Sequence, residues 1–219
     1  MSENPYDLAD GRGMQSAIRL AGRFANRARS RRYDWYLRTM RPARDERLLD
    51  VGCGGSWSLA ERDPEAMVTG VDLIDRGGFE RPNQRFVAAD ACKLPFEDDS
   101  FDLAYSNSLV EHIAVERRPD FAAEIRRVAR RYWVQTPNYW FPIEPHALLP
   151  GAQFLPEPAR RVAWRASPRG IDYEDSLRLL KAGELARLFP DALILHERAG
   201  PLTKSLVAVG PRELFRERR

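Results

Sequence analysis

Short apolar runs recur through the middle of the chain, and several of them are followed directly by glycine or aspartate. The runs are Arg47–Val51, Val68–Val71, Arg85–Ala89, Phe101–Ser106 and Tyr132–Gln135. Continuous apolar runs of this length are typical of parallel strands that are buried on both faces. Helical patterns lie between the runs, most clearly over Phe121–Arg131. Strands that alternate with helices predict βαβ units and an open, parallel sheet.

Two segments flank this core. From Met14 to Met40, apolar residues recur at helical spacing with arginines between them, which predicts one or two amphipathic helices. Near the C-terminus, the pattern predicts a helix over Ser176–Leu188 and two late strands, Ala192–Leu195 and Ser205–Val209. The charged tail from Pro211 onward is expected to fray.

Prolines and aromatic residues break the alternation in the stretch 139–175. The aromatic residues there include Tyr139, Trp140, Phe141, Phe154 and Trp164. A segment this long is uncommon as a plain loop, so we interpret it as a lid over a ligand site.

The first apolar run leads into a glycine-rich turn, Gly52-Cys-Gly-Gly-Ser56, where glycines let backbone N–H groups approach a ligand closely. Asp72 follows the second run, about 20 residues after Gly52, the spacing at which a carboxylate meets a ribose diol. Asp90 follows the third run, where a carboxylate and the next backbone N–H, that of Ala91, can bind the amino edge of adenine. Because these strand ends converge on one crevice of an open sheet, the pattern predicts an adenosine-bearing ligand.

The motifs, taken in order, resemble the class I S-adenosylmethionine-dependent methyltransferase family. The resemblance rests on Leu48-Leu-Asp-Val-Gly-Cys-Gly54, Gly70-Val-Asp72 and Ala89-Asp-Ala-Cys-Lys-Leu-Pro-Phe-Glu-Asp-Asp-Ser-Phe-Asp-Leu103, and it extends over 47–138. The most similar branch is the small-molecule type that includes the ubiquinone-pathway enzymes. The resemblance implies an α/β, Rossmann-like fold with a seven-stranded, mostly parallel sheet, helices on both faces and an antiparallel last strand.

The family also implies S-adenosyl-L-methionine as cofactor and a set of residues that bind it: Asp50, Gly52, Gly54, Asp72, Asp90, Ala91 and Asn107. Asp50 and Gly52 would contact the methionine end, although Asp50 could instead cap a loop. Asp72 would hold the ribose hydroxyls, and Asp90 with Ala91 the adenine.

The motifs include one position expected near the methyl group and one that departs from the family pattern. Asn107, beyond the fourth run, would border the transferring methyl group. Ser56 stands where the family usually has a third glycine, which permits close packing of helix on strand, so the turn geometry departs from the pattern there. A dehydrogenase fits less well, because the full Gly-x-Gly-x-x-Gly is absent.

Two histidines are candidate catalytic residues. His112 follows the fourth run in Leu109-Val-Glu-His-Ile113, where the family places residues near the methyl group, and His146 lies in the lid. We predict that both face one pocket and that one acts as a general base, with Glu111 and Glu144 orienting or replacing them. His196, in a late strand, is expected to be structural.

The lid segment also indicates what kind of molecule accepts the methyl group. The segment from Thr136 to His146 resembles a subgroup of bacterial methyltransferases whose acceptors are often sugars or lipid-linked glycans. Its aromatic residues would stack on such an acceptor or attach the lid to the core.

The charge and composition of the chain bear on which partners it binds. The net charge is only +3, and lysine occurs only at 93, 181 and 204, so arginine supplies nearly all of the 35 basic residues. Because these charges are spread along the chain, they argue against a nucleic-acid partner. Arg27, Arg29, Arg31 and Arg32 form either a solvated helix face or an arm for an anionic substrate or a membrane surface.

Other sequence features concern location and metal chemistry. No apolar run reaches the roughly 18–20 residues of a membrane span, and the N-terminus lacks a secretory pattern, so we expect a cytoplasmic protein with at most peripheral membrane contact. Cys53 and Cys92 are the only cysteines, without metal-ligand spacing, so neither a disulfide nor a metal is expected.

The sequence thus predicts four parts: an N-terminal helical arm or cap (1–44), a cofactor-binding core (45–138), a lid insertion (139–175) and a C-terminal helix with the last two strands (176–219). The function expected is methylation, at oxygen, of a small-molecule or lipid- or sugar-linked acceptor. Two alternatives stay open: a catalytically silent cofactor-binding scaffold or partner subunit, and a nucleic-acid methyltransferase.

Overall fold

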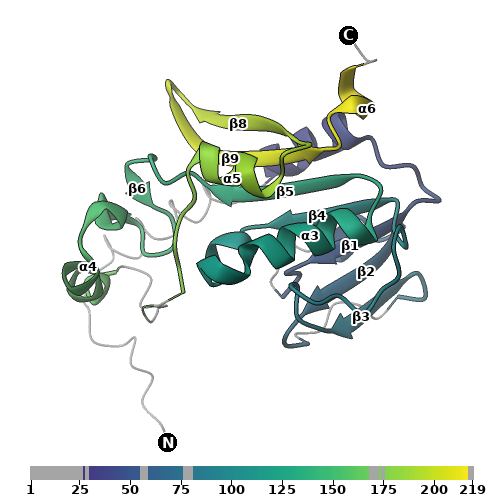
Figure 1. The fold of residues 1–219 in the computed structure, drawn as a ribbon, viewed down its shortest axis with the longest axis horizontal. Coiled ribbons are helices and arrows are strands. Elements are labelled where there is room, and N and C mark those ends of the chain that lie inside the picture. Colours follow the sequence, from purple (N-terminus) through teal and green to yellow (C-terminus); the bar gives the residue numbers. More distant parts are fainter. Residues whose placement is uncertain are drawn as a thin grey trace, which may run out of the picture. The chain divides into compact units, whose positions relative to one another are not determined.

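The computed structural model describes residues 27, 30–54, 59–75, 81–167, 173 and 176–216 (Figure 1). The chain divides into two compact units between Arg41 and Pro42. In the first unit, residues 30–40 form a helix, within the amphipathic segment predicted from Met14 to Met40. Most of that segment, including Arg29, lies outside the described residues.

In the second unit, seven strands form one sheet in the order β3-β2-β1-β4-β5-β9-β8. Neighbours from β3 through β5 pair in parallel, whereas β9 pairs antiparallel with both β5 and β8. The predicted mostly parallel sheet with an antiparallel last strand is confirmed. The strands are β1 (Arg47–Val51), β2 (Met67–Asp72), β3 (Gln84–Ala88), β4 (Leu103–Asn107), β5 (Tyr132–Pro137), β8 (Leu193–Ala199) and β9 (Leu202–Gly210).

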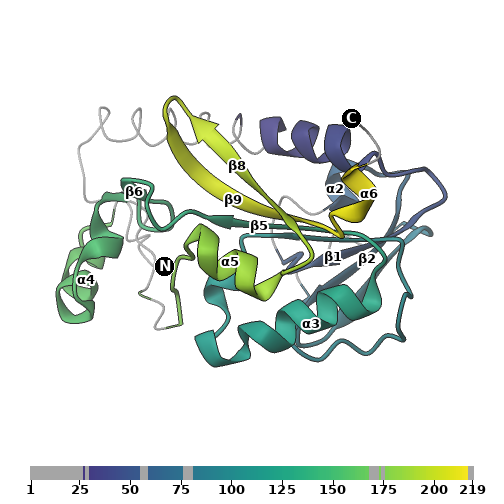
Figure 2. The ribbon, with the colours of Figure 1, turned by 45° about the horizontal axis from the view of Figure 1, so that its top comes forward.

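Helices cover both faces of the sheet, as the family resemblance implied (Figure 2). Helices α3 (Arg118–Val128) and α5 (Ala182–Leu188) lie on one face, and the short α2 (Leu59–Arg62) lies on the other. Phe121 and Ile125, on one side of α3, are fully buried in the core. Burying an apolar side chain of this size stabilises the fold by about 1.5–3 kcal/mol.

Helix boundaries differ from the predicted ones. Helix α3 begins at Arg118, with a proline in its first turn, and ends at Val128 because Ala129 adopts an extended backbone with φ −135°. The predicted helix over Ser176–Leu188 is wrong in its first half, since helix α5 begins only at Ala182. Instead, Leu180 forms a parallel bridge with Asn138 and is fully buried, so pairing with another part of the fold overrides the local pattern.

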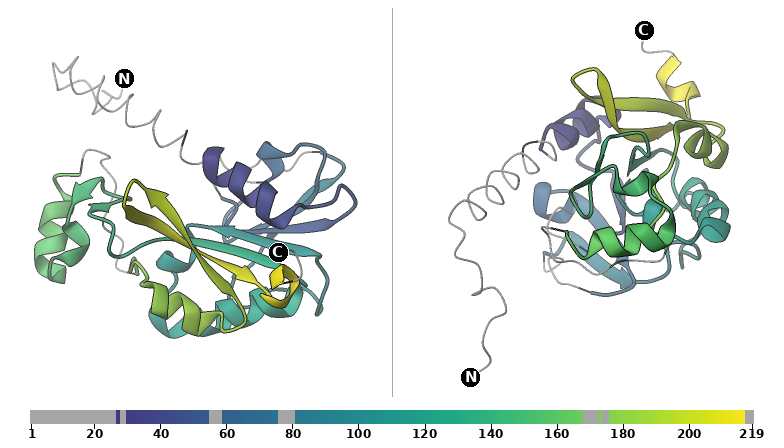
Figure 3. Two further views of the ribbon diagram at one scale, coloured as in Figure 1. Left: turned by 90° about the horizontal axis from the view of Figure 1, so that it is seen from above. Right: turned by 90° about the vertical axis from the view of Figure 1, so that its left-hand side faces the viewer.

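The stretch after β5 is a structured element and not a loop. It contains the two-stranded hairpin of β6 (Ile143–Glu144) and β7 (Leu149–Pro150), the short 3-10 helix η3 (Ala152–Phe154) and helix α4 (Glu157–Trp164). A small core of its own contains Ala147, Trp164 and Leu177. The element lies beyond the carboxyl end of β5 in the views of Figure 1 and Figure 3.

The C-terminal tail also differs from expectation, because helix α6 (Glu213–Arg216) occupies part of the segment predicted to fray. Among the described residues, no helix combines the length and apolar character needed to cross a bilayer.

Candidate active site

The turn after β1 requires glycine at two positions. Gly52 has φ +81°, and a Cβ there would lie 2.9 Å from Cδ2 of Leu109. A Cβ on Gly54 would lie 2.6 Å from Oδ2 of Asp72. Any larger residue would therefore strain the turn or displace the aspartate. Gly55 and Ser56, the position that departs from the family pattern, lie outside the described residues.

Asp72 is the last residue of β2, and its carboxylate lies beside the glycine turn. Its Oδ2 accepts from the Gly54 N–H at 2.9 Å, and its Oδ1 accepts from the Leu73 N–H at 2.8 Å. Because a carboxylate oxygen can accept two hydrogen bonds, each oxygen keeps one further acceptor position. The half-buried Asp72 thus has the chemistry needed to accept from a vicinal diol.

Asp90 lies two residues beyond the end of β3 at Ala88, not at the strand end itself. Its Oδ1 accepts from the Cys92 N–H at 2.9 Å, and its Oδ2 forms a 2.7 Å ion pair with Arg117. The Cys92 N–H and the Arg117 guanidinium hold the pKa of Asp90 below its usual value, so the carboxylate is charged and can accept from an amino group. Ala91, which follows it, is half-buried.

Asp50 is buried in β1, where its Oδ2 accepts from the Leu59 N–H at 2.7 Å. This contact caps the N-terminal end of α2, which is the structural role that the sequence left open for Asp50. Burial raises the pKa of Asp50 to about 7. Its contact with the methionine end of the cofactor stays a prediction, as does the role of Asn107, which is the last residue of β4 and not beyond it.

Two histidines from distant parts of the chain meet at the carboxyl edge of the sheet. The 3-10 helix η1 (Val110–His112) follows β4, and His146 lies between β6 and β7. The rings of His112 and His146 are 4.9 Å apart, centroid to centroid, and nearly perpendicular at 89°. The structure therefore brings together the pair that the sequence predicted to share a pocket, while their catalytic roles stay a prediction. His196 is exposed on β8, where its Nδ1 lies 3.2 Å from Oγ1 of Thr203.

Two buried glutamates adjoin the histidine pair, and we call Glu111, His112, Glu144 and His146 the Glu–His centre. Oε1 of Glu144 lies 2.7 Å from Nδ1 of His146, and its Oε2 accepts from the Ala147 N–H at 2.5 Å. Glu111 accepts from Thr136 Oγ1 at 3.0 Å through Oε2, and its Oε1 lies 3.8 Å from Nε2 of His146. Both glutamates are almost completely buried, so their carboxyl groups act on the histidines with little screening by water.

Arg118 fixes the loop that carries Glu111 and His112. Its guanidinium donates to the carbonyls of Ile113 at 3.0 Å, Glu111 at 3.3 Å and Arg178 at 2.7 Å. The Arg178 N–H also donates to the Glu111 carbonyl, at 2.9 Å. This network connects η1 to the segment that follows the lid. Sequence analysis missed Arg118, because an arginine in the first turn of a helix has no local feature that predicts burial.

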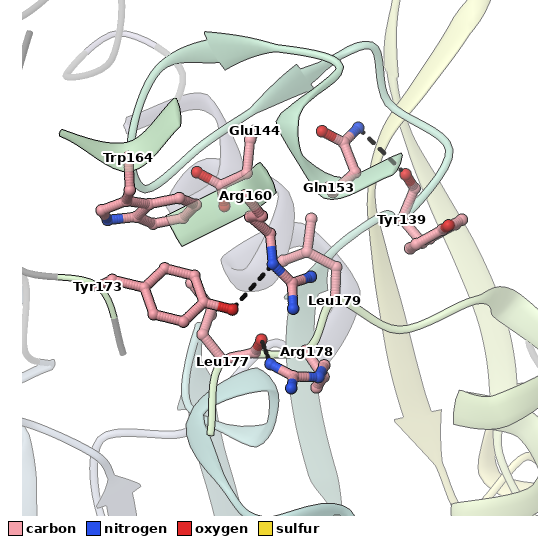
Figure 4. Close-up of a pocket in the computed structure, with 9 residues that line it drawn as sticks. All are labelled: Tyr139, Glu144, Gln153, Arg160, Trp164, Tyr173, Leu177, Arg178 and Leu179. Atoms are coloured by element: carbon pink, nitrogen blue, oxygen red, sulfur yellow. Dashed lines mark hydrogen bonds between the residues drawn. The ribbon is translucent and has the colours of Figure 1, made fainter. Parts of the chain in front are cut away.

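A small cavity of about 50 Å³ lies under α4, next to the Glu–His centre (Figure 4). The rings of Trp164 and Tyr173 are perpendicular at 88° with centroids 5.3 Å apart, and Nε of Arg160 donates to the Tyr173 hydroxyl at 2.9 Å. Glu144 lines this cavity and also contacts His146, so it connects the cavity to the histidine pair. The lining residues are Tyr139, Glu144, Gln153, Arg160, Trp164, Tyr173, Leu177, Arg178 and Leu179.

The strand order, the glycine turn and the acidic residues after β2 and β3 define a Rossmann-like α/β protein built to bind an adenosine-bearing cofactor at the carboxyl ends of its strands. Residues 49–132 match the family model described as a methyltransferase domain. This segment, which is less than half of the chain, is therefore similar to methyltransferase domains, and it contains the glycine turn and both acidic residues.

Curated relatives match part of the chain. Malonyl-(acyl-carrier protein) O-methyltransferase of Pseudescherichia vulneris is 40% identical over 83 residues, which are 36% of this chain and 33% of that protein. The ubiquinone/menaquinone biosynthesis C-methyltransferase of Paracoccus denitrificans is 33% identical over 111 residues, 44% of this chain and 42% of that protein. The chain therefore spans less than half the length of these relatives.

Among solved structures, the 1,6-didemethyltoxoflavin-N1-methyltransferase of Burkholderia thailandensis is similar with a TM-score of 0.51 and 19% identity, over 95% of this chain and 92% of that one. At this identity the likeness concerns the fold, and it extends through the lid and the last strands.

Proposed function

We propose that this protein transfers the methyl group of S-adenosylmethionine to a hydroxyl oxygen of a small-molecule or lipid- or sugar-linked acceptor. The observation that carries the proposal is the contact between the rings of His112 and His146, 4.9 Å apart, with the buried Glu144 on the far side of His146. An oxygen acceptor must lose a proton as it attacks, whereas an amine or an acidic carbon needs less help. A centre of imidazoles and carboxylates at the cofactor edge suits an oxygen acceptor.

The residues present fit the cofactor. Gly52 and Gly54 hold the turn open where a Cβ would intrude on Leu109 or Asp72. Asp72 retains acceptor positions for the ribose hydroxyls, and the charged Asp90, with the Ala91 N–H, suits the amino edge of adenine. When bound, S-adenosylmethionine supplies a methyl group already activated on a sulfonium.

The Glu–His centre can prepare one ring nitrogen to accept a proton. Nδ1 of His146 lies 2.7 Å from the Glu144 carboxyl group, and the tautomer with its proton on Nδ1 would donate to Glu144 and leave Nε2 as an acceptor. Such an acceptor can take the proton of a hydroxyl group held beside it, a contribution of about 10²–10⁴ in rate. Arg118 acts as a positioning residue, because its guanidinium joins the loop of Glu111 and His112 to Arg178 in the segment that follows the lid.

The cavity under α4 supports an acceptor with a further recognised group. Its aromatic rings, Trp164 and Tyr173, offer a flat apolar surface, and Arg160 places a cation next to them. The cavity of about 50 Å³ is small, so it would hold one end of an acceptor and not the whole molecule. An anionic or hydroxyl-rich group on an apolar body matches this lining.

The outer side of the lid supports the lipid-linked class in particular. Trp140 is 62% exposed and Phe154 is 45% exposed, and their rings lie 6.1 Å apart. Nζ of Lys181 lies 5.4 Å from the centre of the Trp140 ring. An exposed aromatic pair beside a cation favours contact with an anionic lipid surface.

The test is to incubate the purified protein with S-adenosylmethionine carrying a labelled methyl group and with polar and lipid fractions of a cell extract. Mass spectrometry then identifies labelled products and the atom methylated. The expected result is a labelled methyl ether that the double variant His112→Ala/His146→Ala does not form. Binding of S-adenosylmethionine without any labelled product in either fraction would favour the silent scaffold.

A further inference from the structure

Three side chains of the Glu–His centre form a donor set for a metal ion. One ligand atom each from Glu111, His112 and His146 lies within 4.8 Å of the other two. Two neutral imidazoles with one carboxylate are a ligand set that zinc takes in catalytic sites, where a fourth position stays open. Sequence analysis expected no metal, because the two cysteines lack metal-ligand spacing. It did not group these three residues as ligands, since His146 joins Glu111 and His112 only through the fold of the lid.

Glu111 and His146 are separated by a distance that suits a shared ion. Nε2 of His146 and Oε1 of Glu111 are 3.8 Å apart, which is too long for a hydrogen bond. Ligands of a tetrahedral zinc ion lie about 3.4 Å from each other, given metal–ligand distances of about 2.0–2.2 Å. Because all three ligand atoms lie within 4.8 Å of one another, a contraction of at most about 1.4 Å in any pair would complete the site.

Glu111 provides the second, independent observation. Its side chain is 0% exposed, and its Oε1 has no hydrogen-bond partner within the described part of the chain. A buried carboxylate oxygen without a partner is destabilising, because burial removes its hydration without replacement. The other oxygen, Oε2, accepts from Thr136 and is thereby held in place. The unpartnered oxygen is the one that faces His146.

Glu144 completes the arrangement from outside the donor set. Its contact with Nδ1 of His146 at 2.7 Å orients the ring so that Nε2 faces Glu111. A histidine that binds a metal commonly donates its other ring N–H to a carboxylate in this way. Glu144 is itself fixed by the Ala147 N–H, so the orientation of His146 depends on two buried contacts.

We propose that Glu111, His112 and His146 bind a divalent zinc ion, with Glu144 as the positioning residue for His146. The use of the ion in catalysis rests on the proposed function, whereas its binding does not. With zinc bound, Nε2 of His146 is a ligand and no longer accepts a proton, so the ion takes the place of that nitrogen in promoting proton loss from the acceptor hydroxyl. At the open position the ion would take the acceptor hydroxyl and lower its pKa. The acceptor O–H bond breaks and its proton passes to water. The oxygen–methyl bond forms as the methyl–sulfur bond breaks, S-adenosylhomocysteine leaves, and zinc keeps its oxidation state.

The test measures zinc binding directly. Protein stripped with a chelator is dialysed and then titrated with Zn²⁺ against a chromophoric chelator. We expect one zinc ion per chain in the parent protein. His146→Ala and His112→Ala should each weaken zinc affinity at least about 100-fold, and Glu144→Gln about 10- to 100-fold. The matched control is His196→Ala, which removes an exposed histidine elsewhere and should bind as the parent does.

Glu111→Gln completes the series, and circular dichroism and affinity for S-adenosylhomocysteine monitor folding in every variant. The proposal is overturned if the parent binds no zinc under these conditions, or if the His112 and His146 variants bind it as tightly as the parent. Zinc binding without methyl transfer would support the site and contradict the proposed function. Full methyl transfer by protein that binds no zinc would support the proposed function and contradict the zinc site.

Discussion

The backbone N–H of Gly54 donates to the carboxylate of Asp72 at 2.9 Å, and so joins the turn after β1 to the end of β2. The two segments would carry neighbouring parts of the cofactor. This one hydrogen bond therefore fixes the relative position of the turn and the Asp72 carboxylate, and a Cβ at Gly54 would displace that carboxylate.

Loss of an acidic side chain from this edge should weaken cofactor binding. We expect Asp72→Ala and Asp90→Ala each to weaken binding of S-adenosylmethionine by about 1–3 kcal/mol, because each removes hydrogen bonds that involve a charged acceptor. Isothermal titration calorimetry measures the change. Glu65→Ala, which removes a surface partner of Arg44, is the control and should bind as the parent does. Tight binding of NADH with no binding of S-adenosylmethionine would contradict the cofactor assignment.

The two histidines should affect turnover and not cofactor affinity. We expect His112→Ala or His146→Ala to lower kcat by about 10²- to 10⁴-fold for the residue more directly engaged with the hydroxyl proton. The other substitution should mainly raise KM, as loss of uniform binding does. Steady-state kinetics with the acceptor that the labelling experiment identifies separates the two effects. If both variants turn over at the parental rate, the acceptor atom needs no proton removal and is nitrogen or carbon.

The buried Asp50 should make stability depend on pH. Its pKa in the folded protein is about 7, above the ordinary value of 3.8, so the folded state holds a proton that the unfolded state loses first. Stability from this group is therefore fully present below about pH 3.8 and declines as pH rises through about 7, by on the order of 1.4 kcal/mol per pH unit at most.

The matched variant for this prediction is Asp50→Asn, which keeps an oxygen for the Leu59 N–H but cannot ionise. Urea denaturation of both proteins without cofactor, between pH 5 and 8, gives the comparison. We expect the free energy of unfolding of the parent to fall relative to that of Asp50→Asn as pH rises. Parallel pH profiles would show that Asp50 does not titrate in this range.

The N-terminal arginines offer a test of the nucleic-acid alternative. We expect that replacing Arg27, Arg29, Arg31 and Arg32 with glutamine leaves any weak binding of DNA or RNA almost unchanged, because the basic residues are spread along the chain. Fluorescence anisotropy with labelled oligonucleotides at several salt concentrations measures this. A drop in affinity of about tenfold or more, with a steep salt dependence in the parent protein, would support nucleic acid as the substrate.

Local features of the sequence were sufficient for the strands and for the cofactor edge. Apolar runs predicted β1 with its observed bounds and the other strands to within a few residues, because the interior strands of a parallel sheet are buried on both faces. The placement of Asp72 and Asp90 followed from topology, since carboxyl ends of parallel strands lie on one edge. Helix ends were less accurate, as at α5, where pairing of Leu180 with Asn138 replaced a helical turn.

The sequence by itself thus determined the fold class and placed its candidate cofactor residues at strand ends, because both depend on periodicity and on residue types at those ends. Only the tertiary structure decided what Asp50 and Arg118 contact and how the lid is built. The lid has a small core of its own around Trp164, and its short β6–β7 hairpin places His146 against His112. Within this arrangement, Glu144 orients the ring of His146 toward Glu111. These contacts join residues far apart in the chain and depend on how side chains pack, which no local pattern records.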